Sequence, residues 1–205
     1  MSWRHVSPQF AGLMWMTGTA ACYASSYVTM GLLTQQMSIY EVTLIRSVLA
    51  CLFLGPWIML IRPRAILVTR WKVYWIRSLA TYGAMLCTIY GLANIAVADV
   101  TALIMASPIF TVLFAAAFLK ERVGLHRWIA LLVAGSGALL IIRPGFTEVT
   151  LASFAGLLAA FGYVIANAGT KTLTGTDHPD AVAFWMYALI IPLSAGPAFY
   201  HWTTP

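Results

Sequence analysis

Residues 100–119 read VTALIMASPIFTVLFAAAFL and contain no charged side chain. A helix of about 20 apolar residues crosses the hydrocarbon core of a bilayer, which is roughly 30 Å thick. The rest of the chain has the same character, because 61% of the 205 residues are hydrophobic and only 9% are charged. So few charges cannot cover the surface of a soluble domain, whereas a lipid-facing surface needs none. The sequence therefore predicts an all-α integral membrane protein.

Further uncharged stretches cover residues 6–40, 47–61, 78–98, 128–142, 149–170 and 181–200. The stretch 47–61 has 15 residues. At about 1.5 Å per residue, a helix of this length spans roughly 22 Å and is too short to cross the hydrocarbon core. We therefore expect its helix to extend back past Arg46. The stretch 128–142 is equally short, but Arg127 and Arg143 flank it and can extend to the two interfaces along their apolar stems. Together these stretches predict about seven transmembrane helices.

Lysine and arginine are distributed unequally between the predicted loops. Nearly all of them lie before residue 6 or in the connections that follow the second, fourth and sixth stretches, while Arg143 lies on the other side and Arg46 within the membrane. Cytoplasmic loops carry such an excess. We expect a cytoplasmic N-terminus in a multi-pass protein of the bacterial inner membrane. The net charge of +6 follows from this loop bias, so nucleic acid is not an expected partner.

Two short matches indicate an internal repeat. Phe-Ala-Gly-Leu at 10–13 recurs at 154–157, and Gly-Pro at 55–56 recurs at 196–197. Both offsets correspond to a unit of about five helices, and an odd number inverts the second copy relative to the first. We expect a first five-helix copy over residues 1–145 and a truncated second copy of two helices over 146–205. Inverted repeats are typical of transporters, which bind substrate near the midplane where the copies meet.

The sequence around the fourth and fifth stretches resembles a known family. The residues that carry the resemblance are ALIMASPIF at 102–110, FLKER at 118–122 and Trp128, then Gly135, Gly137, Leu140, Ile141, Arg143 and Pro144. They are similar to the fourth and fifth helices of EamA-type members of the drug/metabolite transporter superfamily. Tyr90 with the Gly-Leu-Ala that follows it, and Arg46 within its helix, also fit.

This resemblance implies ten helices in two inverted halves, with both termini cytoplasmic, and export or exchange of small metabolites. Relative to that pattern the chain lacks the last three helices. We therefore expect it to transport poorly alone and to recover with three further helices or as a homodimer.

Arg46 is a candidate substrate-binding residue because an ionisable group within the membrane is costly to keep there. If it faces a cavity, it favours a carboxylate or another anion. An alternative is that it extends to the outer interface, toward Glu41 or Asp99. The sequence leaves both readings open.

Ser107 and Pro108 lie near the centre of the stretch 100–119. Proline removes a backbone hydrogen bond and frees the carbonyl of Ile104, which kinks a helix. Such discontinuities occur at transporter sites. We expect the kink to shape a cavity, in preference to direct contact by Ser107.

Several polar-tipped side chains on the predicted helices prefer a partner or a wet cavity to lipid. Each could be an interfacial anchor or an interhelical hydrogen bond, but together they suggest a cavity lined by rings and hydroxyls. They are Tyr23, Tyr82, Tyr90, Asn94, Tyr163, Asn167 and Trp185. Small residues at four-residue spacing, such as Gly18, Cys22 and Ser26, predict close helix packing instead.

Other membrane functions lack their residues. A retinal protein needs a lysine in its last helix, and none follows Lys171. Ala134 stands where the Gly-x-Ser-Gly motif of an intramembrane protease has its first glycine, and no metalloprotease or nucleotide-binding motif occurs. No catalytic residue, metal or cofactor is expected. The sequence favours a transporter of small metabolites or drugs that works by alternating access without ATP; the alternative is a non-transporting membrane fragment or assembly partner with the same fold.

Overall fold

The computed structural model describes residues 8–61, 63–68, 70–105, 107–118, 124, 128–129, 131–133, 135–137 and 150–202. Regular structure within these residues is entirely helical. The helices are α1 (Pro8–Leu33), α2 (Ile39–Ile61), α3 (Trp71–Asn94), α4 (Val97–Ile104), α5 (Ser107–Phe118), α7 (Leu151–Thr174) and α8 (Pro179–Tyr200), with a short 3-10 helix η1 (Pro63–Ile66). The predicted all-α class is confirmed. Within the expected helix over 128–142, residues 128–129, 131–133 and 135–137 are helical, and the others lie outside the described residues.

Three of the described helices, α2, α7 and α8, are long and apolar enough to cross a membrane by length and composition. Helix α2 begins at Ile39 and continues through Arg46 to Ile61. The expectation that this helix extends past the arginine is therefore confirmed. Helices α1 and α3 have 26 and 24 residues, which at about 1.5 Å per residue exceeds the thickness of the hydrocarbon core.

The stretch 100–119 does not form one continuous helix. Helix α4 ends at Ile104, Met105 is a turn, and α5 begins at Ser107. Pro108 is thus in the first turn of α5, where a missing backbone N–H costs no intrahelical hydrogen bond. The interruption lies where the Ser-Pro pair predicted a discontinuity.

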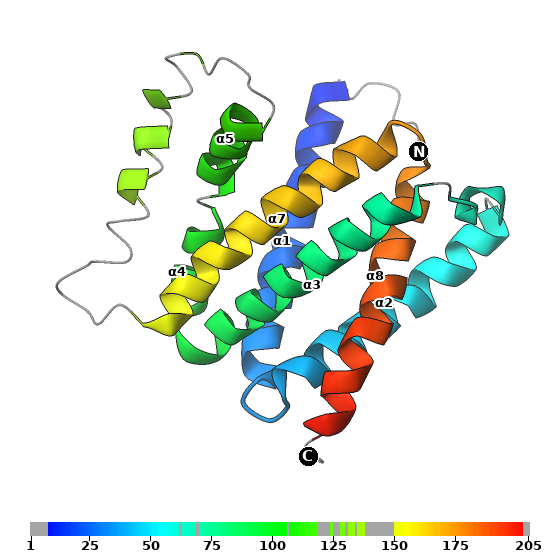
Figure 1. Cartoon of the computed structure of the whole chain (residues 1–205), viewed down its shortest axis with the longest axis horizontal. Helices are drawn as coiled ribbons and strands as arrows, with labels where there is room; N and C mark the ends of the chain where they lie inside the picture. Colours follow the sequence, from blue (N-terminus) through cyan, green and yellow to red (C-terminus); the bar gives the residue numbers. More distant parts are fainter. Residues whose placement is uncertain are drawn as a thin grey trace.

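Helices α3 and α7 lie side by side along much of their lengths, and α2 packs against α8 (Figure 1). Glycines allow the close contacts of α7. A Cβ on Gly162 would lie 2.9 Å from Cβ of Ala84, and one on Gly156 would lie 2.8 Å from Cδ1 of Leu103. Since glycine lets helix backbones approach closely, these positions set the packing of α7 on α3 and α4.

The helices that the repeat matches run in opposite directions. In Figure 1, α1 (blue) descends from its N-terminal end while α7 (yellow to orange) rises, and α2 (cyan) rises while α8 (orange to red) descends. Opposite directions are what inverted copies require. The division into copies at 145 and 146 remains a prediction.

The small-residue face of α1 does not pack as expected. A Cβ on Gly18 would meet no atom of the described residues within 4 Å. Cys22 is exposed, and large apolar side chains such as Trp15 are exposed on the same helix. The prediction of close packing at Gly18 and Cys22 was therefore wrong for this part of the structure, because none of the described helices covers that face.

Candidate functional site

A polar cavity of about 500 Å³ lies where the helices converge. Each of the seven described α-helices contributes at least one side chain to its wall. The lining consists of Tyr23, Tyr27, Arg46, Arg77, Thr81, Met85, Ile104, Ser107, Tyr163, Ala166, Asn167, Thr170, Met186 and Tyr187. A cavity of this size, with a few convergent polar groups among apolar ones, is typical of a small-molecule site.

Arg46 reaches this wall from the second turn of α2. Its Nη1 lies 3.2 Å from Sδ of Met30 on α1, and its side chain is half-buried. A thioether sulfur is a weak acceptor, while a guanidinium carries five N–H donors. Within the part of the chain that the structure describes, most of the N–H donors of Arg46 therefore remain open to a ligand or water.

Arg77 is the second cation of the cavity. Because the uncharged stretch begins at residue 78, the sequence predicted Arg77 in a cytoplasmic connection. The structure corrects this, because α3 begins at Trp71 and Arg77 lies inside it, 7% exposed. Its Nε donates to Oγ1 of Thr170 on α7 and its Nη1 to the carbonyl of Val182 on α8, both at 2.8 Å. The arginine thus joins three helices, and its other donors have no hydrogen-bond acceptor among the described residues.

A helical periodicity around Arg77 could have revealed its position. Tyr74, Ser78 and Thr81 are buried with it on one face of α3, at spacings of three or four residues. The uncharged-stretch criterion excluded this turn because it stopped at the first charge. A search for helical periodicity that allowed charged residues would have included the turn that contains Arg77.

Tyrosine is the most frequent residue type in the cavity wall. Tyr163 on α7 lies with its Oη 3.3 Å from Oγ1 of Thr88 on α3, and Tyr23 and Tyr27 come from α1. Tyr187 on α8 completes the group. Four rings with hydroxyl tips can provide both apolar contact and hydrogen bonds to a solute. Tyr27, Thr81, Thr170 and Tyr187 were not among the predicted residues.

The structure brings Arg46, Ser107, Tyr163 and Asn167 together in the cavity wall, with Tyr23 beside them. Helix positions alone could not establish this convergence. The other predicted site residues, Tyr82, Tyr90, Asn94, Pro108 and Trp185, do not line this cavity.

Three of those five have other surroundings. Nε1 of Trp185 donates to the carbonyl of Ile66 at 2.9 Å, and its ring packs edge-on against Trp71, so it anchors the connection after α2. Nδ2 of Asn94 donates to the carbonyl of Tyr90 in its own helix. The buried Oη of Tyr82 has no hydrogen-bond partner among the described residues.

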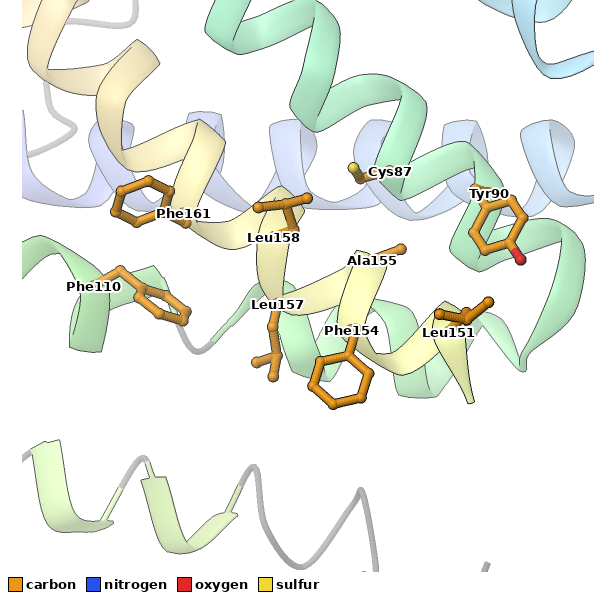
Figure 2. A pocket seen from close by; sticks show the side chains of 9 residues that line it. All are labelled: Cys87, Tyr90, Phe110, Leu151, Phe154, Ala155, Leu157, Leu158 and Phe161. Carbon is orange, nitrogen blue, oxygen red and sulfur yellow. The ribbon is translucent and has the colours of Figure 1, made fainter. Parts of the chain in front are cut away.

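Tyr90 instead borders an apolar groove of about 690 Å³ between α3, α5 and α7. Figure 2 shows the groove lined by Phe110, Phe154, Phe161 and several leucines. Its nearly uniform apolar lining offers little to orient a polar solute. We therefore assign the candidate site to the polar cavity.

Metal chemistry has no visible basis in this part of the chain. No cluster of three or more His, Cys, Asp or Glu side chains occurs among the described residues. The cavity wall offers guanidinium, hydroxyl and amide groups and aromatic rings. It is suited to hydrogen bonding and stacking with an organic solute.

A bundle of apolar helices around a polar cavity defines an all-α, multi-pass membrane protein that can hold a small molecule within its span. The chain belongs to the EamA-like transporter family, which matches residues 10–143.

Three relatives illustrate the range of this similarity. The chain is 35% identical over 108 residues to a riboflavin transporter of Rhizobium johnstonii, covering 53% of the chain and 36% of the relative. It is 29% identical over 152 residues to a pseudopaline exporter of Pseudomonas aeruginosa, covering 73% and 52%. It is 21% identical over 194 residues to an S-adenosylmethionine uptake transporter of Rickettsia bellii, covering 95% and 67%.

The matched part of the chain therefore spans about a third to two thirds of the length of these relatives. No solved structure matches the chain.

Proposed function

We propose that this protein exports or exchanges small metabolites or drugs by alternating access, without ATP, and binds them in the polar cavity. The observation that carries the proposal is the convergence of all seven described α-helices on that cavity. A solute held there would contact both expected copies. Rocking of one copy against the other would then open the cavity to either side of the membrane.

The repeat offsets support this assignment. Tyr23 on α1 and Asn167 on α7 are 144 positions apart, the offset of the Phe-Ala-Gly-Leu match. Arg46 on α2 and Tyr187 on α8 are 141 positions apart, the offset of the Gly-Pro match. All four side chains line the cavity, which supports the proposal that equivalent faces of the two expected copies meet around it.

Glycines extend the repeat beyond the short motifs. Gly18 and Gly31 of α1 recur 144 positions later as Gly162 and Gly175, at the same offset as Gly12 and Gly156 of the Phe-Ala-Gly-Leu match. Gly156 and Gly162 are the residues at which α7 approaches its neighbours. In α1, by contrast, a Cβ on Gly12 or Gly18 would meet no described atom within 4 Å. The recurring glycines therefore support the repeat in the sequence but not a shared packing face.

Coupling by a carboxylate has no support in the described cavity wall, which contains neither Asp nor Glu. Glu41 is buried near the start of α2, where its Oε2 accepts from the backbone N–H of Ser38, and Asp99 is exposed on α4. Facilitated exchange without proton coupling is therefore the mechanism we favour. The proposal places the protein in the bacterial inner membrane with a cytoplasmic N-terminus.

Flux measurements test the proposal. Purified protein is reconstituted into vesicles loaded with a bacterial metabolite extract, and mass spectrometry identifies solutes released faster than from empty vesicles. We expect Tyr187→Ala, in the cavity wall, to reduce release, and the control Asn94→Ala, at an exposed site outside it, to leave release unchanged. Absence of flux from folded protein, alone and with a supplied partner, would favour the non-transporting alternative.

A further inference from the structure

The cavity wall has an unbalanced charge. Two of its fourteen described lining residues, Arg46 and Arg77, are permanently cationic, and none is acidic. The two arginines come from different helices, α2 and α3, and line the same cavity. The described part of this space therefore carries a formal charge of two positive units.

Among the described residues, the groups that contact the two arginines are neutral. Arg46 contacts the thioether of Met30, and Arg77 donates to the hydroxyl of Thr170 and the carbonyl of Val182. These acceptors satisfy some of the N–H groups but bring no negative charge. A buried charge without a counter-charge is costly, and the cost is greater within a membrane. Binding of an anion would relieve this cost.

The geometry of the guanidinium groups and the tyrosine rings limits the chemical class of ligand that the cavity can bind. A guanidinium presents paired donors that match the two oxygens of a carboxylate or phosphate group. The four tyrosines of the wall add ring faces and hydroxyl donors around the cations. A small anion with an unsaturated ring would engage both sets of groups.

We propose that the cavity selects small organic anions, with Arg46 and Arg77 binding the carboxylate or phosphate group and the tyrosines binding the ring. This inference rests on the proposed function for the identity of the site but not on any transport measurement. It excludes organic cations as preferred substrates of this cavity.

The electrostatic potential of the cavity can be tested directly with charged thiol reagents. Cys22, Cys51 and Cys87 are replaced by alanine, and a single cysteine is introduced by Asn167→Cys in the cavity wall or by Gln35→Cys in the exposed α1–α2 connection. Labelling rates are measured in nanodiscs with anionic sulfonatoethyl and cationic trimethylammonioethyl methanethiosulfonate. We expect the anionic-to-cationic rate ratio to be about tenfold higher at position 167 than at position 35.

Arginine variants tell whether that ratio comes from the two cations. We expect Arg46→Gln to lower the ratio several-fold and Arg46→Lys to preserve it. Arg77→Lys keeps the positive charge of the interhelical arginine and should likewise preserve the rate ratio. Arg77→Gln is avoided, because it also removes packing contacts and can unfold the bundle. Equal ratios at positions 167 and 35, or a ratio unaffected by Arg46→Gln, would overturn the inference.

Ligand protection then tests selectivity. para-Hydroxyphenylacetate and phenyl phosphate are added as anionic probes, with para-hydroxyphenylacetamide and tyramine as the matched neutral and cationic probes. We expect an anionic probe to slow labelling at position 167 at concentrations about tenfold lower than the amide or amine requires. Equal protection by all four probes, or protection by tyramine alone, would overturn the inference.

The two anionic probes also separate carboxylate from phosphate recognition. The labelling assays contain no transport step, so their failure leaves the proposed transport function standing. Absence of flux with a preserved anionic ratio would instead defeat the transport proposal alone.

Discussion

Nε of Arg77 on α3 donates to Oγ1 of Thr170 on α7 at a distance of 2.8 Å. The two residues are 93 positions apart and lie in different expected copies of the repeat. Both also line the polar cavity. One hydrogen bond therefore connects the cavity wall to the packing of α3 on α7, so a ligand that draws the guanidinium toward itself would also act on the contact between the copies.

Replacement of Thr170 by valine tests the contribution of this bond. Valine preserves the shape of the side chain but removes the acceptor, which leaves a buried Nε–H of Arg77 without its partner. We expect a loss of about 1–3 kcal/mol in the free energy of unfolding. The measurement is reversible unfolding in mixed micelles followed by circular dichroism.

Thr172→Val is the matched control on the same helix. The hydroxyl of Thr172 is exposed and donates to the carbonyl of Ala168, within α7. We expect this variant to resemble the parent protein. Equal stabilities for the two valine variants would show that the bond between Arg77 and Thr170 is not important for folding.

The repeated glycines provide a prediction with an internal control. Gly162→Ala places a Cβ 2.9 Å from Cβ of Ala84, whereas Gly18→Ala, the equivalent change in α1, meets open space. We expect the first to destabilise the bundle by about 1–3 kcal/mol through overpacking. The second should be neutral or stabilise by up to about 1 kcal/mol, because alanine favours helix over glycine.

Thermal unfolding of the two alanine variants in the same detergent measures this difference. Ala84→Gly combined with Gly162→Ala removes the opposing methyl group and should recover part of the loss. The recovery should be incomplete, because the new Cβ also lies 3.2 Å from the carbonyl oxygen of Ala80 and glycine at position 84 lowers the helix propensity of α3. Destabilisation of equal size by Gly18→Ala and Gly162→Ala would contradict the packing described here.

Substitution of Trp185 can distinguish a role in anchoring the chain from a role in substrate binding. Its Nε1 donates to the carbonyl of Ile66, outside the polar cavity. Trp185→Phe removes the donor but retains an aromatic ring, so we expect a loss of about 1 kcal/mol in stability and an unchanged KM for any transported solute. A raised KM with unaltered stability would return Trp185 to the binding site.

Apolar stretches predicted the positions of the described long helices well, because lipid requires such stretches wherever a helix crosses. They failed at Arg77, where the helix begins before the charge that ended the uncharged stretch. The spacing of small residues also predicted close packing at Gly18, where a Cβ would meet no described atom. Small residues show where another helix could approach, but not whether one does. Which faces converge on one cavity depends on tertiary packing, so Tyr27 and Tyr187 could not be selected from a single sequence.

The membrane orientation predicted from the loop charges can be tested by reporter fusions. We expect fusions after Arg70, Arg122 and Gly175 to report the cytoplasm, and fusions after Ser38, Phe146 and Pro205 to report the outside. Phosphatase and fluorescent-protein reporters give opposite signals for the two sides. A cytoplasmic signal after Pro205 would show that the number of spans has been miscounted.

Arg46 provides the sharpest test of how the cavity binds its solute. Arg46→Lys preserves the positive charge but replaces the planar pair of donors by a single ammonium group. If Arg46 holds an anionic group through two parallel hydrogen bonds, lysine should raise the KM for transport about tenfold, and Arg46→Gln should raise it further. Arg70→Lys, at an exposed residue before α3, is the control and should leave KM unchanged. Vesicle flux measured over a range of solute concentrations separates KM from the maximal rate. Unchanged flux for both Arg46→Lys and Arg46→Gln would remove Arg46 from the site and leave it as a cation that extends toward the outer interface.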